Sequence, residues 1–295
     1  MMVDPEVSGH QIGDRPLPSL FSGCPMFSPT FLTRPLTLVA VTLTTTAIAI
    51  LGTLPPSQAL STDVPLVQQT ASPETVEQLQ LMEGLAKLED GNPNQAIAIF
   101  NQVINKNSNS ADAFNLRGVA YMVLAQYPKA LADLDQAIRL NPNDPVIYFN
   151  RANVYGVLED FDAAAADCGQ AIQLDPTDAD LFICRGQARL ALEQPEAALL
   201  DFDQALELNP RLEEAFYFRG VAHAMLENYS QALADLNRAL NLNPYNADAL
   251  VLRAGVKAEQ GNQTGSVEDM INAINLLERR GETQKAAEIR GLLGY

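Results

Sequence analysis

The sequence is poor in the residue types that metal sites and nucleic-acid interfaces need. It contains no Trp, two His and three Cys among 295 residues, and the Cys have no short paired spacing. A structural zinc site needs four Cys or His ligands at such spacings, so we expect no metal. Only 19 Lys and Arg stand against 36 Asp and Glu, which gives a net charge of −17. Because phosphate contacts need a basic face, we expect no nucleic-acid partner.

The sequence also lacks the motifs of common catalytic sites. It has no Gly-rich phosphate loop and no serine nucleophile elbow, and its carboxylates recur at regular intervals instead of converging. We therefore expect a protein that is not an enzyme, with no catalytic residue, no cofactor and no small-molecule substrate. Hydrophobic residues make up 47% of the chain but aromatic ones only 6%, which predicts a core built mainly from aliphatic residues and Ala.

The N-terminal segment is typical of an export signal. Residues 35–54 carry no charge, Arg34 precedes them, and Ser57 and Ala59 provide the small residues that a signal peptidase requires. We expect cleavage after Ala59, and Met26 as the true start would give the signal an ordinary length. A retained membrane anchor is the alternative, because about twenty apolar residues can just span a bilayer. Residues 60–76 predict a short linker.

The rest of the chain repeats every 34 residues without an insertion or deletion. Six rows result, at residues 77–110, 111–144, 145–178, 179–212, 213–246 and 247–280. We number the columns from the first residue of each row. Columns 8, 20 and 27 hold small residues in nearly every row, columns 4 and 24 are mostly large and apolar, and column 32 is Pro in rows two to five. Each row therefore predicts two helices that approach closely, the second ending before the Pro.

This pattern resembles the tetratricopeptide repeat family, in its exported bacterial form, over residues 77–280. The resemblance implies a fold class that is all-α, a right-handed α-solenoid of six 34-residue helix-turn-helix repeats whose first helices line a concave groove. Residues 281–295 predict a C-terminal capping helix with Ala286, Ile289 and Leu293 on one face. Row one departs most from the pattern, because it has Gln80 in column 4 and no Pro in column 32.

Two charged columns occur together in rows two to six and are both missing from row one. Column 7 holds Arg117, Arg151, Arg185, Arg219 and Arg253, and column 23 holds Asp133, Asp167, Asp201, Asp235 and Asp269. The joint absence in row one favours structural ion pairs, since a partly buried guanidinium needs a carboxylate. A row of Arg that binds an anion is the weaker interpretation.

The concave wall is expected at columns 2, 5, 9 and 12 of the first helices. We expect the partner-binding groove to include Asn115, Val119, Met122, Phe149, Asn153, Ile183, Gln187, Tyr217 and Val221. Apolar anchors mixed with amides suit an extended peptide or a partner helix. The alternative is that several of these residues only pack against neighbouring helices.

Column 2 is acidic in four rows. We call Asp112, Asp180, Glu214 and Asp248 the acidic rim. Carboxylates in a first helical turn usually cap the helix or complement its dipole. The alternative is a negative rim that selects a basic partner.

Three other residues have simpler interpretations. His223 occupies the column of Tyr121 and Tyr155, which predicts a packing residue. Cys168 and Cys184 lie in adjoining rows and could meet, but both fit as small buried hydrophobic residues, and we favour that over a disulfide.

The sequence therefore favours a non-catalytic adaptor that binds a protein or peptide in its groove. Together with the export signal, this predicts a periplasmic or lumenal protein that assembles an extracytoplasmic or membrane complex and meets the membrane only through an uncleaved N-terminal segment. A self-associating scaffold that stacks through its terminal repeats is the alternative function.

Overall fold

The computed structural model describes residues 72–293. The predicted export signal, the cleavage at Ala59 and the start at Met26 lie outside these residues. Within them the chain forms helices and no strand. The predicted fold class, an all-α solenoid, is confirmed.

The helices follow one another as six antiparallel pairs and a final single helix. The pairs are α3 (Pro73–Glu89) with α4 (Pro93–Lys106), α5 (Ala111–Val123) with α6 (Tyr127–Leu140), α7 (Pro145–Val157) with α8 (Phe161–Leu174), α9 (Ala179–Ala191) with α10 (Pro195–Leu208), α11 (Glu213–Met225) with α12 (Tyr229–Leu242), and α13 (Ala247–Glu259) with α14 (Gln263–Arg279). The final helix is α15 (Thr283–Leu292), which packs against α14 and buries Ala286 and Ile289.

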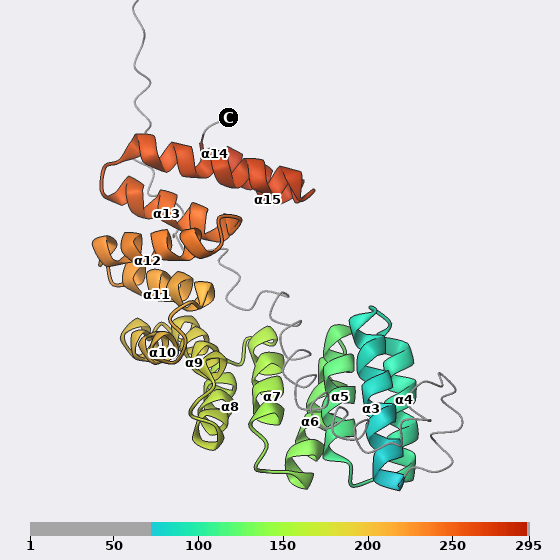
Figure 1. The fold of residues 1–295 in the computed structure, drawn as a ribbon. Coiled ribbons are helices and arrows are strands. Elements are labelled where there is room, and N and C mark those ends of the chain that lie inside the picture. Colours follow the sequence, from blue (N-terminus) through green and yellow to red (C-terminus); the bar gives the residue numbers. More distant parts are fainter. Residues whose placement is uncertain (1–71, 294–295) are drawn as a thin grey trace, which may run out of the picture.

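The pairs stack into a curved row (Figure 1). Each second helix contacts the first helix of the next pair, and successive first helices also contact one another along the whole row. Successive second helices make no comparable contact among the described residues. The first helices α3, α5, α7, α9, α11 and α13 therefore lie on the inner side of the bend.

Local sequence determines where the helices end. In rows two to five the residue before the column-32 Pro is the C-cap of the second helix, with extended backbone at Asp175 and Asn209. The turn inside each pair places column 15 in the left-handed region, with φ from 54° at Ala125 to 77° at Gly261. This conformation closes the first helix, because the next residue's N–H can then reach back into the helix, as Gln126 N does to Tyr121 O.

The first pair begins earlier than the repeat pattern. The Ser72 hydroxyl accepts a hydrogen bond from the Thr75 N–H, and Pro73 occupies the first helical turn. Both features favour a helix start, so α3 begins four residues before row one. Residues 73–76 therefore belong to this helix and not to the linker predicted at residues 60–76.

Each pair is closed by contact between columns 8 and 24. A Cβ atom added to Gly84 or Gly186 would lie 2.3 or 2.5 Å from the ring of Phe100 or Phe202. The two rows with Ala in column 8, at Ala152 and Ala254, have smaller or more flexible partners in column 24. We call this contact between the two helices of a pair the seam. In each row the size of the column-8 residue is therefore complementary to that of the column-24 residue.

Replacing Gly186 with Ala should lower the free energy of unfolding by about 1–3 kcal/mol, because the new methyl group overpacks against Phe202. Gly169→Ala is the control, since its added Cβ meets only ordinary contacts, at 3.9 Å or more. Urea unfolding of both variants measures the difference. If Gly186→Ala proved as stable as Gly169→Ala, the seam would not be tightly packed.

Candidate partner-binding surface

Five arginines join the two helices of their own pairs. Each column-7 Arg donates from Nε and Nη2 to the column-23 Asp sixteen residues later, at N–O distances of 2.7–3.2 Å. The five Asp residues are buried, whereas the Arg side chains are 18–24% exposed. The structure thus places the predicted residues together as bidentate ion pairs.

The same arginines also reach the preceding pair, which the sequence patterns did not indicate. The Nη1 atoms of Arg117, Arg151, Arg219 and Arg253 donate to column 25 of the row before, at Asn101, Asp135, Asp203 and Asn237. The distances are 2.5–2.7 Å. We call the contacts of the five arginines with columns 23 and 25 the arginine ladder. At the four arginines that bond to column 25 it joins three helices and so fixes the stacking of consecutive pairs.

Column 11 provides a second cation in two rows. Arg189 donates to Asp201, and Lys257 lies 2.7 Å from Asp269. Burial by itself raises the pKa of Asp269, but the hydrogen bonds from Arg253 and Lys257 outweigh burial and lower it. This carboxylate therefore stays charged.

Aromatic rings flank the guanidinium groups. Arg117 lies over the rings of Phe114 and Tyr121, at 5.3 and 5.9 Å from their centroids. Arg151 lies in the same way between Tyr148 and Tyr155. These cation–π contacts and the hydrogen bonds to Asp engage the guanidinium groups within the fold, which favours the structural interpretation over an anion-binding row.

The acidic rim lies at the starts of the first helices but does not cap them. The capping oxygens come from column 34, at Ser110, Asp144, Asp178 and Asn246. Asp112 and Asp248 are exposed, and Asp180 and Glu214 are half-buried. Their negative charge still complements the helix dipoles.

The nine predicted groove residues lie on α5, α7, α9 and α11, and all are buried, with exposures from 0% to 6%. Phe149, Ile183, Tyr217 and Val221 belong to one core cluster, and Val119 and Met122 to another. Packing against neighbouring helices therefore accounts for the burial of the six apolar groove residues. This favours the alternative that these side chains only fill the core.

The buried amide residues differ from the apolar groove residues, because some of their polar atoms have no hydrogen-bond partner among the described residues. Asn150 Nδ2 donates to Asn115 Oδ1 at 2.8 Å, and Gln187 Nε2 donates to Glu214 Oε1 at 3.3 Å, each across consecutive first helices. Within the described part of the chain, Asn150 Oδ1, Gln187 Oε1 and both polar atoms of Asn153 make no hydrogen bond. We call Asn150, Asn153 and Gln187 the amide row. Only Asn153 and Gln187 were predicted as site residues; Asn150 was missed because column 6 was not among the columns expected to line the groove.

Cys168 and Cys184 form a disulfide, with their Cα atoms 6.0 Å apart. The expectation of two free buried Cys was therefore wrong. The stacking of the pairs places column 24 of one row opposite column 6 of the next. Patterns within single columns of the sequence could not show that these two columns meet.

His223 lies in the seam, as expected from its column. Its Nε2 is 3.9 Å from Asp235 Oδ2, and its buried Nδ1 has no hydrogen-bond partner among residues 72–293. Burial lowers its pKa, Asp235 opposes this shift, and Arg219 adds to it. The imidazole therefore takes up a proton less readily than an ordinary His side chain. Residues 72–293 contain no group of His, Cys, Asp or Glu that could hold a metal ion.

The geometry thus defines an α-helical repeat scaffold. Three tetratricopeptide repeat models match the sequence, one at residues 111–144 and 145–178, one at 185–247 and one at 78–110. Together they cover more than half of the chain, which belongs to the tetratricopeptide repeat family. Proteins of this family bind protein or peptide partners, and the chain is a protein–protein interaction scaffold.

Solved structures of similar fold include YrrB, described as a TPR protein with an unusual peptide-binding site. It is 25% identical, with a TM-score of 0.51, and the match covers 64% of this chain and 97% of YrrB. Pseudomonas aeruginosa pilF is 18% identical, with a TM-score of 0.63, over 72% of this chain and 96% of its own. At that identity it shows the fold alone. No curated protein matches the sequence.

Replacing Asp201 with Ala should lower the free energy of unfolding by about 3–5 kcal/mol, because Arg185 and Arg189 lose their shared buried partner. Asp203→Ala is the matched control. Its carboxylate is 56% exposed, so its loss should cost less than about 1 kcal/mol. Chemical denaturation of both variants measures the costs, and equal values would contradict a structural role for the buried pair.

His223 should make stability depend on pH. Its pKa in the folded protein lies below the ordinary 6.5, so the unfolded chain takes up a proton first as the pH falls. Stability should therefore fall as the pH drops below about 6.5 and then level off below the folded pKa. The stability difference between wild type and His223→Gln, measured by urea unfolding from pH 8 to 5, should follow this course. A difference independent of pH would refute it.

Proposed function

We propose that this protein binds an extended segment of a partner protein along the inner side of its solenoid. The observation that carries the proposal is the amide row. Leaving a buried polar atom unpaired costs about 1–3 kcal/mol, so a sequence selected only for stability would have apolar residues there. Asn153 alone leaves one donor and one acceptor group unpaired.

The amide row matches a peptide backbone chemically. An extended strand presents alternating N–H and C=O groups, and the row offers unpaired acceptors at Asn150, Asn153 and Gln187 with one unpaired donor at Asn153. Asn153 and Gln187 occupy column 9 of consecutive rows, on α7 and α9. Because these atoms are buried, binding has to be accompanied by local opening of this surface.

The acidic rim supports a partner with basic side chains. It lies at the starts of α5, α9, α11 and α13, of which α9 also carries Gln187, and the chain as a whole carries a charge of −17. Positive residues next to the bound segment would therefore raise the association rate at low salt. The likeness to YrrB, a TPR protein described as having an unusual peptide-binding site, points to the same class of ligand.

We further propose that the protein works outside the cytoplasm, in assembling an extracytoplasmic or membrane complex. The Cys168–Cys184 disulfide supports this, because disulfides persist mainly in oxidising compartments. The charge-free residues 35–54 and the small residues at Ser57 and Ala59 are consistent with it. Within residues 72–293, no helix is long and apolar enough to cross a membrane.

Replacing both Asn153 and Gln187 with Leu separates binding from folding. The apolar side chains remove unpaired buried atoms, so the variant should be at least as stable as wild type, with a gain of about 1–2 kcal/mol. Binding to an immobilised array of about eight-residue peptides that includes Lys- and Arg-rich sequences should fall at least tenfold.

Gln173→Leu on α8 is the control, because that amide is exposed on a second helix. It should bind the array like wild type, and binding by wild type should weaken with added salt. Unchanged binding by the Asn153→Leu, Gln187→Leu variant would refute the proposed function.

A further inference from the structure

The arginine ladder is interrupted at one junction between pairs. At the other junctions the Arg Nη1 atom donates to a column-25 side chain of the preceding pair. Between the third and fourth pairs that column holds Gly169, which has no side chain to accept. Arg185 donates only to Asp201 of its own pair among the hydrogen bonds of residues 72–293.

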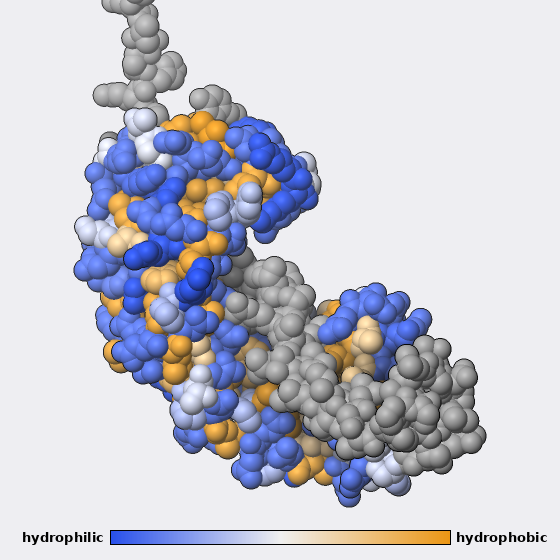
Figure 2. All heavy atoms as spheres, in the orientation of Figure 1, coloured by the Kyte–Doolittle hydropathy of each residue, from blue (hydrophilic) through white to orange (hydrophobic). Residues whose placement is uncertain are grey.

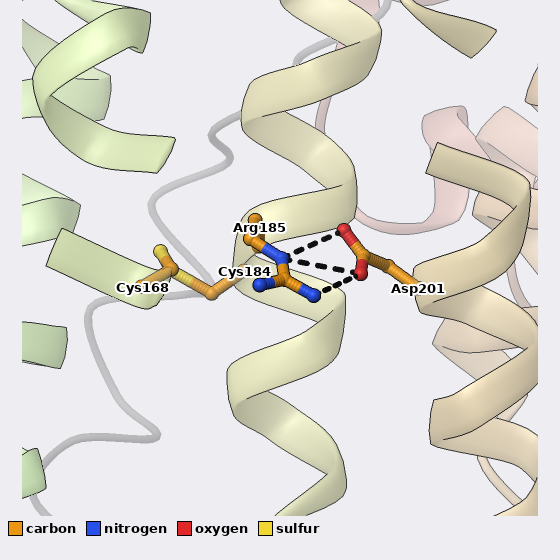
Figure 3. Close-up of a disulfide and its surroundings, with 4 residues drawn as sticks. All are labelled: Cys168, Cys184, Arg185 and Asp201. Atoms are coloured by element: carbon orange, nitrogen blue, oxygen red, sulfur yellow. Dashed lines mark hydrogen bonds and ion pairs between the residues drawn. A yellow bond between two sulfur atoms is a disulfide. The ribbon is translucent and has the colours of Figure 1, made fainter. Parts of the chain in front are cut away.

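The disulfide lies next to this gap. Cys168 and Cys184 each stand one residue before Gly169 and Arg185, and they join α8 to α9 over the same sixteen-residue separation as the missing polar link. Figure 3 shows the disulfide on one side of α9 and the Arg185–Asp201 pair on the other. A covalent bond therefore spans the one junction where the arginine ladder does not.

The gap has room for the missing side chain. A Cβ atom added to Gly169 would lie 3.9 Å from Arg185 Cδ and 4.0 Å from Arg185 Nη1, both ordinary contact distances. Sterics therefore do not require Gly at this position, and its φ is not in the left-handed region. An Asp placed here would meet Arg185 Nη1, as Asp135 and Asp203 meet theirs.

We propose that the Cys168–Cys184 disulfide is a redox-dependent lock on the junction between the third and fourth pairs. A dithiol reductant opens it by attack of one thiolate on a Cys sulfur and release of the other Cys as a thiol. The second thiol of the reductant then displaces the first Cys, so the reductant is oxidised to its own disulfide and both Cys become thiols. Both Cys are at most 1% exposed, so attack follows local opening of the junction.

The disulfide should also affect peptide binding by the amide row, a consequence that rests on the proposed function. Asn150 and Asn153 lie on α7 in the third pair, and Gln187 lies on α9 in the fourth. The amide row therefore spans the locked junction. Releasing the lock lets the two parts move relative to each other, so reduction should weaken peptide binding.

Amide hydrogen exchange tests the lock without any ligand. Dithiothreitol treatment of the wild type, or the double change Cys168→Ala and Cys184→Ala, should speed exchange in α8 and α9 at least tenfold and leave α11 and α12 unchanged. Adding Gly169→Asp to the double variant should restore most of the protection, because it supplies the missing acceptor. Gly169→Ala is the matched control for helix propensity and should restore less.

Equal exchange in oxidised and reduced protein would overturn the proposal, as would equal rescue by Asp and Ala at residue 169. The peptide array separates this result from the proposed function. If oxidised protein binds no peptide but exchange still depends on the disulfide, the proposed function fails and the lock stands.

Discussion

The structure depends on one recurring interaction, in which an Arg of an inner helix bonds to the second helix of its own pair and, for four of the five arginines, also to the second helix of the preceding pair. The guanidinium has five donors in a fixed plane, so it can bind a carboxylate of its own pair with two and a side chain of the preceding pair with a third. Arg151, for example, holds Asp167 and Asp135 together. Lys could not replace Arg here, because its ammonium group is a compact point charge without the rigid planar set of donors that binds a carboxylate with two hydrogen bonds. The arginine ladder thus sets both the shape of a pair and its stacking.

The exposed surface shows little specialisation. The exposed large hydrophobic residues are spread along the chain, for example Leu200 on α10 and Tyr245 in the turn before α13, and Figure 2 shows hydrophobic residues scattered over a largely hydrophilic face. The proposed recognition therefore rests on the unpaired polar atoms along the inner helices. Such atoms lower stability, and the arginine ladder and the apolar seams compensate for them. Functional sites often contain such local conflicts with the rules that stabilise the fold.

Most of the fold could be predicted from the sequence because helix pairs interact only with their neighbours. A 34-residue period, small residues at Gly118 and Gly186 and a Pro after the second helix in rows two to five specify a pair, and repetition specifies the row. The ion pairs were predictable for the same reason, since both partners lie within one row. Part of the candidate site was also predictable, because Asn153 and Gln187 recur at one column.

Apart from the early start of α3 at Pro73, the features that the sequence missed join residues of different rows. The Nη1 bonds of the arginine ladder, the disulfide and the hydrogen bond between Asn150 and Asn115 depend on how far one pair is rotated and shifted against the next. Burial of Phe149 and Tyr217 depends on it too. The sequence by itself determined the helices, the pairs and their order. Only the tertiary structure decided which columns of adjacent pairs meet, because that stacking geometry is the sum of many side-chain contacts and is not encoded at any single position.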